Sequence, residues 1–133
     1  MSQKPAVLVT RKLPEAVEAR LRRDYTPEFN PEDRLYSTEE LLERTKGKEA
    51  IVACHTEHFT PEVISRLPET VRAIANFSVG VDHVDLAAAK SRRLLVTNTP
   101  DVLSDATAEI AMLLMLGAAR RASEGERLVR ADK

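Results

Sequence analysis

The chain has 133 residues, of which 43% are hydrophobic and 31% charged, and its 20 basic and 21 acidic side chains give a net charge of −1. This length provides for one ordinary hydrophobic core, and the balanced charge excludes an electrostatic argument for nucleic acid or an anionic membrane as partner. One cysteine, Cys54, excludes a disulfide framework and predicts a reducing, cytoplasmic location.

Strands and helices are predicted to alternate along the first hundred residues. Short apolar runs predict strands at residues 6–10, 25–29, 50–54, 71–77 and 94–96. Capping residues or prolines mark the starts of four short helices, at Pro14, Ser37, Thr60 and Asp85. Because the connections are too long for hairpins, we expect a parallel sheet with helices on both faces. The predicted architecture is an α/β, flavodoxin-like three-layer sandwich with strand order 2-1-3-4-5.

In that strand order, ligands bind beyond the carboxyl ends of the strands, near the switch between strands one and three. This edge is predicted to carry residues 10–11, 55–56 and 78–80. Two other proteins of this fold are disfavoured by Arg11 and Lys12, which follow the first strand. A phosphoacceptor receiver needs acidic residues at this place, and a flavodoxin needs a glycine-rich phosphate loop. Nowhere in the chain are glycines spaced as a dinucleotide or nucleotide phosphate loop requires.

The pattern changes after Pro100. A polar loop over residues 101–105 leads into a predicted helix over residues 106–121, with Asp105 as its N-cap. Residues 110–116 are apolar on every face, and the longest apolar run, 110–119, is about half of a bilayer span. A helix of this kind must be covered all round, so we expect it to fold back or to pack against another body. The predicted domains are therefore 1–100, and 101–133 as a hinge and a dimerisation helix.

Three motifs together resemble one family. They are FSVGVDHVD at residues 77–85, VTNTP at 96–100 and TAE at 107–109. This combination resembles the amino-terminal part of the D-isomer-specific 2-hydroxyacid dehydrogenases, and most of all the glyoxylate/hydroxypyruvate reductases. The resemblance extends over residues 7–121 and implies the substrate-binding, so-called catalytic, domain of an oxidoreductase. In that family a Rossmann domain that binds NAD or NADP comes next in the chain.

The resemblance also implies what the chain lacks. The family's glycine-rich loop and its catalytic arginine, glutamate and histidine would follow Lys133, so no catalytic residue is assigned here. We expect a fragment that is inactive alone, that binds no NAD or NADP tightly, and that belongs to an enzyme reducing a small 2-oxo acid by hydride transfer. The alternative is an autonomous, non-catalytic flavodoxin-like module that self-associates through its apolar helix.

Four site residues are carried over from the family. Val79 and Gly80 match the loop whose backbone N–H groups hold the substrate carboxylate, although a plain strand-to-helix turn would give the same pattern. His55 matches a substrate-pocket position. Thr107 matches a residue that touches the nicotinamide end of the cofactor, although its hydroxyl could equally bond local backbone. Asn98 and Pro100 match the interdomain hinge, and the apolar helix matches a subunit interface, which implies a homodimer.

Two other groups invite a functional interpretation. Cys54, His55 and His58 could suggest zinc, but a fourth ligand is absent nearby and Cys54 is expected to point into the core, so no metal site is predicted. His83 could suggest a general base, but we expect it to cap or pack at a helix start.

Overall fold

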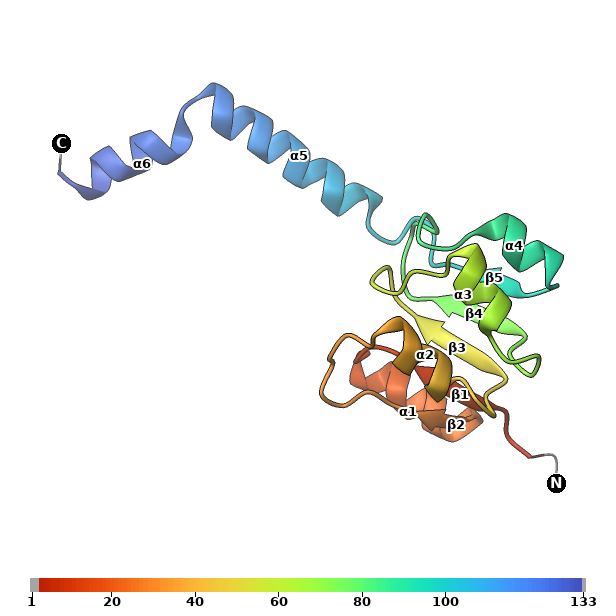
Figure 1. Ribbon diagram of the computed structural model, residues 1–133. Coiled ribbons are helices and arrows are strands. Elements are labelled where there is room, and N and C mark those ends of the chain that lie inside the picture. Colours follow the sequence, from red (N-terminus) through yellow and green to blue (C-terminus); the bar gives the residue numbers. More distant parts are fainter. Residues whose placement is uncertain (1–2, 133) are drawn as a thin grey trace. The chain divides into compact units, whose positions relative to one another are not determined.

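The computed structural model describes residues 3–132, which divide into one unit up to Pro100 and a second unit from Asp101 onward. In the first unit, strands and helices alternate along the chain (Figure 1). They are β1 (Ala6–Val9), α1 (Glu15–Asp24), β2 (Thr26–Glu28), α2 (Thr38–Arg44), β3 (Ala50–Ala53), α3 (Pro61–Arg66), β4 (Ala73–Asn76), α4 (Leu86–Ser91) and β5 (Leu95–Thr97). All four strand pairs are parallel in the order β2-β1-β3-β4-β5, which confirms the predicted sheet.

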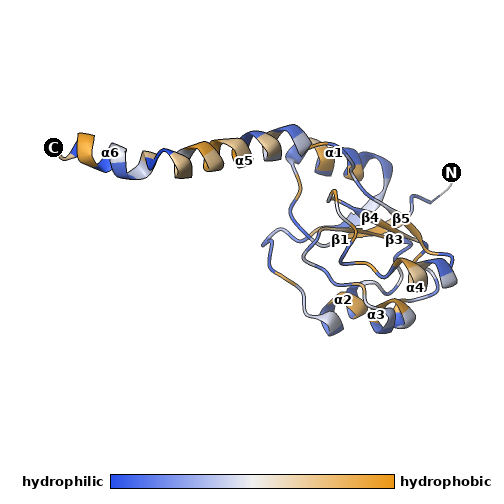
Figure 2. Ribbon diagram, turned by 90° about the horizontal axis from the view of Figure 1, so that it is seen from above, coloured by the Kyte–Doolittle hydropathy of each residue, from blue (hydrophilic) through white to orange (hydrophobic). Residues whose placement is uncertain are grey.

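Helices cover both faces of this sheet. Figure 2 shows α1 on one face and α2, α3 and α4 on the other. The larger core cluster lies under α2, α3 and α4, and Leu8, Ile51 and Ile74 at its centre are fully buried. The smaller cluster lies under α1 and is centred on Val7 and Val9. Because β1 is buried on both faces, its sequence is apolar without alternation.

The helix starts of the first unit are fixed by local hydrogen bonds. Ser37 Oγ accepts from Glu40 N–H at 3.2 Å, and Asp85 Oδ1 accepts from Ala88 N–H at 2.7 Å. Thr60 caps α3 in the same way. Each of these bonds satisfies a donor that the helix itself cannot pair, which explains why the sequence located the starts correctly.

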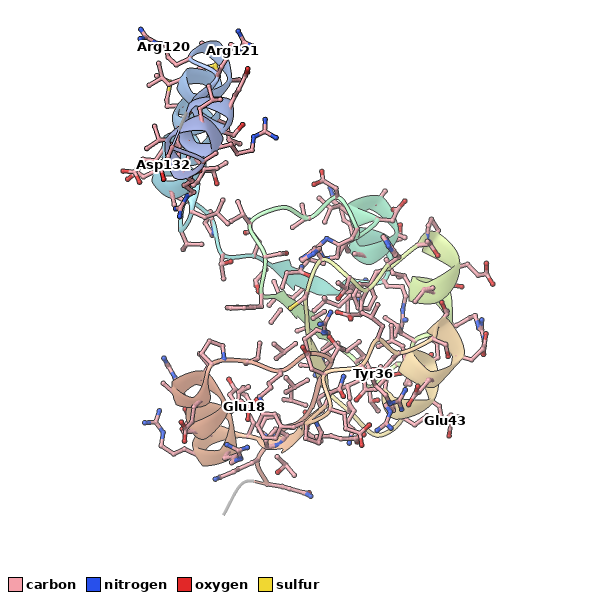
Figure 3. All side chains as sticks on the ribbon, turned by 90° about the vertical axis from the view of Figure 1, so that its left-hand side faces the viewer. Glu18, Tyr36, Glu43, Arg120, Arg121 and Asp132 are labelled. Carbon is pink, nitrogen blue, oxygen red and sulfur yellow. The ribbon has the colours of Figure 1, made fainter. Side chains whose placement is uncertain are left out.

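The segment between β2 and α2 is held by one aromatic ring. Tyr36, labelled in Figure 3, contacts two guanidinium groups, with ring centroid distances of 5.2 Å to Arg34 and 4.7 Å to Arg44. Glu40 pairs with both arginines, and their hydrogen bonds, that of Arg34 above all, lower its pKa to about 2. This cluster anchors a long connection that has no regular secondary structure.

The second unit consists of α5 (Ser104–Ala119) and α6 (Ala122–Arg130), separated by Arg121 in a left-handed conformation with φ 51°. Leu103 is the N-cap of α5, so the prediction of Asp105 as N-cap was wrong; Asp105 lies in the first turn, where a carboxylate still favours the helix dipole. Neither helix has a buried residue. Among the described helices, none combines the length and apolarity needed to cross a membrane.

Candidate functional site

The carboxyl ends of β1, β3 and β4 lie at one edge of the sheet. The parallel hydrogen bonding continues past the strands, because Thr10 N–H donates to Val52 O at 3.0 Å and Phe77 N–H donates to Ala53 O at 2.7 Å. The loops that follow these strands therefore leave the sheet side by side, as expected for a ligand-binding edge.

A pocket of about 280 Å³ opens between the loops that follow β3 and β4. Its lining residues are His55, His58, Ser78, Gly80, Asp82 and His83. The structure thus brings His55 and Gly80 to one pocket, with Val79 between two of the lining residues. A neighbouring hollow of about 480 Å³ shares His58, Asp82 and His83 and extends to the starts of α3 and α4.

Two backbone amides of the loop after β4 are free to bind a ligand. Within residues 3–132, the N–H groups of Val79 and Gly80 donate to no protein acceptor. The carbonyls beside them are occupied, because Thr99 N–H donates to Ser78 O at 2.9 Å and Asn98 Nδ2 donates to Val79 O at 2.7 Å. Adjacent unpaired N–H groups of this kind form a site for an anion such as a carboxylate.

Gly80 is the residue that keeps this loop open. A Cβ at this position would lie 2.9 Å from Asp82 Oδ2, closer than real Cβ contacts, so a side chain here would displace the Asp82 carboxylate. The same proximity places a negative charge beside the free amides. An anion bound here would be held by directed N–H donors rather than by a general positive field.

His83 is held from behind the pocket by a buried amide. Asn76 is 3% exposed; its Nδ2 donates to Thr97 O at 2.9 Å, and its Oδ1 lies 2.9 Å from His83 Nε2. Since Asn76 Oδ1 is an acceptor, His83 carries its proton on Nε2. Burial lowers the pKa of His83, and electrostatic interaction with the neighbouring imidazoles of His55 and His58 lowers it further. His83 therefore lines the pocket as a neutral ring whose Nε2 is held by Asn76, while Asp85 caps α4.

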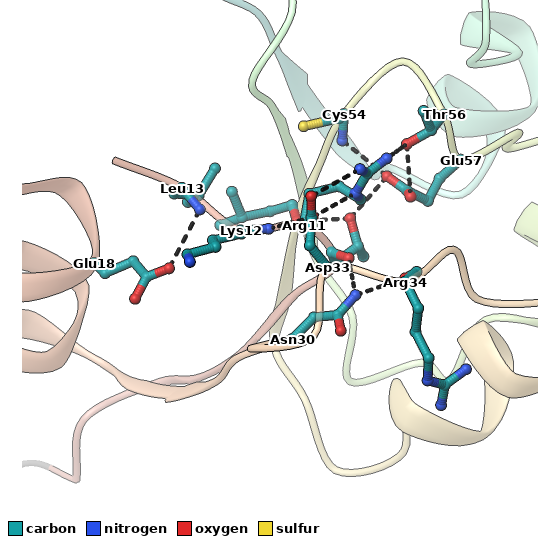
Figure 4. Close-up of polar contacts among 12 residues, drawn as sticks. Arg11, Lys12, Leu13, Glu18, Asn30, Asp33, Arg34, Cys54, Thr56 and Glu57 are labelled. Carbon is teal, nitrogen blue, oxygen red and sulfur yellow. Dashed lines mark hydrogen bonds and ion pairs between the residues drawn. The ribbon is translucent and has the colours of Figure 1, made fainter. Parts of the chain in front are cut away.

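Glu57 is a buried carboxylate that locks the turn bearing His55 (Figure 4). Its side chain accepts three hydrogen bonds, from Thr10 Oγ1 at 2.7 Å, Cys54 N–H at 2.9 Å and Thr56 Oγ1 at 2.9 Å. A buried carboxylate is costly unless its oxygens are bonded, and these donors satisfy it. The turn after β3 is thereby fastened to the end of β1.

Sequence reasoning missed both Glu57 and Asn76. Asn76 is the last residue of β4 and Glu57 lies in the turn after β3, and both side chains are buried. The sequence signal for a buried carboxylate at Glu57 was the presence of two hydroxyl donors, Thr10 and Thr56. Their pairing could be recognised only once the strand order brought the two loops together.

Arg11 is engaged in a neighbouring ion pair. Its Nε lies 2.8 Å from Asp33 Oδ1, and its Nη1 donates to Thr56 Oγ1 at 3.1 Å. The hydrogen bonds from Arg11 and from Lys12 N–H lower the pKa of Asp33 to about 2. This arrangement ties the loop before α2 to the same edge, and it commits the Arg11 guanidinium to a structural contact.

Cys54 is half-buried, so the expectation of a core-facing thiol was wrong. The reason is that β3 ends at Ala53, one residue earlier than predicted, and Cys54 belongs to the following turn. Burial raises the pKa of the Cys54 thiol, and the Glu57 carboxylate adds to that rise. Among the described residues, no three or more His, Cys, Asp or Glu side chains are arranged to hold a metal ion.

Thr107 lies in α5 of the second unit, where it is exposed. Its N–H donates to Leu103 O at 2.9 Å as part of ordinary helical bonding. The role predicted for its side chain stays a prediction.

Comparisons with known proteins identify the family to which this chain is similar. A family model described as the catalytic domain of D-isomer specific 2-hydroxyacid dehydrogenases matches residues 7–128. The glycerate dehydrogenase of Hyphomicrobium methylovorum is 43% identical over 127 residues, covering 96% of this chain and 39% of that protein. The glyoxylate reductase of Pyrococcus horikoshii is 38% identical over 130 residues, covering 98% of this chain and 39% of that protein.

A solved structure has a similar fold. It is that of a Polaromonas sp. JS6 66 protein provisionally named a D-isomer specific 2-hydroxyacid dehydrogenase, NAD-binding. The TM-score is 0.81 at 44% identity, over 98% of this chain and 41% of that protein. The chain spans about two-fifths of the length of the curated relatives named above.

Proposed function

This chain belongs to the D-isomer specific 2-hydroxyacid dehydrogenase family, and on that premise we propose that its first unit binds the 2-oxo acid substrate of a glyoxylate or hydroxypyruvate reductase. The observation that carries the proposal is the pair of unpaired N–H groups at Val79 and Gly80, beside a pocket lined by His55. The names of the two curated relatives, a glycerate dehydrogenase and a glyoxylate reductase, support this substrate class.

The proposed task of this chain is to bind and orient the carboxylate. Two adjacent N–H donors suit the two oxygens of a carboxylate, and bonds to an ionised acceptor are stronger than bonds between neutral groups. Holding the acid by this end fixes the direction in which its 2-oxo carbonyl points. Neutral His83 and the turn held by Glu57 supply the walls against which the rest of a small acid would pack.

The hydride donor of the whole protein would be NADH or NADPH. The residues of this chain do not fit such a dinucleotide, because its four glycines, Gly47, Gly80, Gly117 and Gly125, lie too far apart for a pyrophosphate-binding turn. We assign no step of hydride transfer to these residues. A contact between Thr107 and the nicotinamide end remains a proposal for the whole protein.

Titration of the ¹⁵N-labelled chain with glyoxylate tests the proposal. We expect the largest amide shift changes at Val79 and Gly80, with smaller changes at His55. Glycolaldehyde, which lacks the carboxylate, is the matched control and should leave both amides unchanged. Changes confined to the basic side chains at the other edge of the sheet, Arg72 and Arg93, would contradict the proposal.

The second candidate is a non-catalytic module that self-associates through α5. It is favoured by the exposed apolar side chains of that helix, among them Leu113, Leu114 and Leu116 at 63%, 66% and 61%. In a steady-state assay with hydroxypyruvate and NADPH, turnover above background would exclude a non-catalytic module. In either case we propose a homodimer, and the free Cys54 thiol supports a reducing compartment such as the cytoplasm.

A further inference from the structure

The two free amides do not orient themselves, because the carbonyls beside them are held by the segment after β5. We infer that Asn98 is a positioning residue for the carboxylate site: its side chain fixes the peptide plane that aims the Gly80 N–H at the substrate. This inference rests on the proposed function. The Asn98 side chain is exposed and lies two residues before the end of the first unit. The inference gives this side chain a part in substrate recognition.

The first step is the geometry of the trans peptide. The described residues contain no cis peptide bond, so each C=O and the N–H of the next residue point in opposite directions. Asn98 Nδ2 holds Val79 O at 2.7 Å, which turns the Gly80 N–H away from Asn98. Thr99 N–H holds Ser78 O at 2.9 Å, which turns the Val79 N–H away from Thr99 in the same manner.

The second step is the strand order. β4 lies between β3 and β5, and Asn98 and Thr99 directly follow β5. A loop after β4 whose carbonyls are held on the β5 side presents its N–H groups toward the β3 side. The pocket lies on that side, because His55 and His58 of its lining belong to the loop after β3.

The third step separates Asn98 from its neighbours. The bond from Thr99 is made by backbone and does not depend on the side chain. Ser78 Oγ donates to Gly80 O at 2.8 Å and so acts on the following peptide plane. Among the side chains of residues 3–132, only that of Asn98 holds the peptide plane that contains the Gly80 N–H. Since Asn98 is exposed, its replacement removes little packing.

The test compares Asn98→Ala with Thr97→Val, a change at a neighbouring exposed side chain that keeps the backbone intact. The probe is oxalate, which carries the carboxylate of a 2-oxo acid and cannot accept a hydride. We expect Asn98→Ala to weaken oxalate binding on the order of tenfold, the cost of one misaligned bond to an ionised acceptor. Thr97→Val should bind like the unchanged chain.

Two further readouts separate positioning from a general structural effect. In the ligand-free chain, Asn98→Ala should shift the Gly80 amide more than the Val79 amide, while the urea midpoint of unfolding stays at the Thr97→Val value. Asn98→Gln, which keeps a donor, should recover part of the affinity, and Asn98→Asp, which sets a carboxylate against Val79 O, should not.

The outcomes are distinguishable. Unchanged oxalate affinity and an unmoved Gly80 amide in Asn98→Ala would overturn the positioning role while leaving the proposed function intact. A fall in affinity that tracks a fall in the urea midpoint, without recovery in Asn98→Gln, would also overturn it. Failure of the unchanged chain to bind oxalate at Val79 and Gly80 would overturn the proposed function and, with it, this inference.

Discussion

The two units of the chain use apolar residues in opposite ways. In the first unit, Leu8, Ile51, Phe59 and Ile74 are completely buried between the sheet and its helices. In the second unit, the apolar helix α5 has no buried residue, and Leu114 is 66% exposed. The difference lies in the sheet, because a layer with two faces gives helices a surface to pack on and a helix pair has none. Apolar content alone therefore does not locate a core.

The sharpest test of this comparison is the double variant Leu113→Lys and Leu116→Lys. If the apolar face of α5 is covered by a second copy, two buried charges per subunit should abolish the dimer at micromolar concentration. Light scattering after size-exclusion chromatography measures this. The matched control is Ser123→Lys with Ala131→Lys, which adds the same charge at exposed positions outside the apolar run. A dimer that survives the first variant would show that α5 is not the interface.

The first unit is expected to depend on Phe59, which is fully buried and whose N–H donates to His83 O at 2.8 Å. Phe59→Ala should lower the free energy of unfolding by about 3–5 kcal/mol, because it leaves a cavity in the larger core. Leu114→Ala is the control in the second unit and should change the free energy of unfolding of the monomer by less than about 0.5 kcal/mol. Urea unfolding followed by circular dichroism gives both values. Equal losses would mean that the two units share one core.

The buried carboxylate gives a third, smaller effect. Glu57→Gln replaces one of the two acceptor oxygens by an NH₂ group, which cannot accept the hydrogen bonds that Thr10, Cys54 and Thr56 donate. The hydroxyl groups can rotate to a new partner, but the backbone N–H of Cys54 cannot. We expect a loss of about 1–3 kcal/mol in the free energy of unfolding. Glu62→Gln, at an exposed position in α3, is the control and should be neutral. A neutral Glu57→Gln would show that the turn bearing His55 is fixed by other contacts.

The smallest effect is a pH dependence confined to the first unit. Burial lowers the pKa of His83 below its ordinary value of 6.5 in the folded chain. As the pH falls, the unfolded chain therefore takes up this proton first, and the free energy of unfolding decreases below about pH 6.5 until folded His83 is also protonated. His83→Gln should flatten this part of the profile, whereas His58→Gln, at an exposed position, should largely preserve it. An unchanged slope in His83→Gln would assign the dependence to other groups.

The sequence predicted the features that depend on local order. Ser37, Thr60 and Asp85 cap helices through bonds to residues three positions away, so their role is visible in a short stretch of chain. The strand order followed from alternation and connection length. Gly80 was proposed as a site residue because its motif, which lies directly after a strand, resembles that of the family; its binding role stays a prediction.

The features that the sequence did not predict depend on contacts between distant segments. Glu57 acts on Thr10, 47 residues away, and Asn98 acts on Val79, 19 residues away. Asp105 was chosen as the N-cap of α5 from its residue type, whereas the helix begins two residues earlier, at Ser104, without a side-chain cap. Long-range polar contacts of this kind become visible only when the sheet brings the loops together.

The half-buried thiol of Cys54 makes it possible to follow the opening of the turn after β3 by chemical labelling. As the sole cysteine, it offers a single attachment point for a thiol-reactive dye or spin label, without any engineered residue. Its raised pKa keeps the thiolate scarce at neutral pH, so the closed turn should be alkylated slowly. Labelling kinetics would then time the opening of the segment that Glu57 fastens.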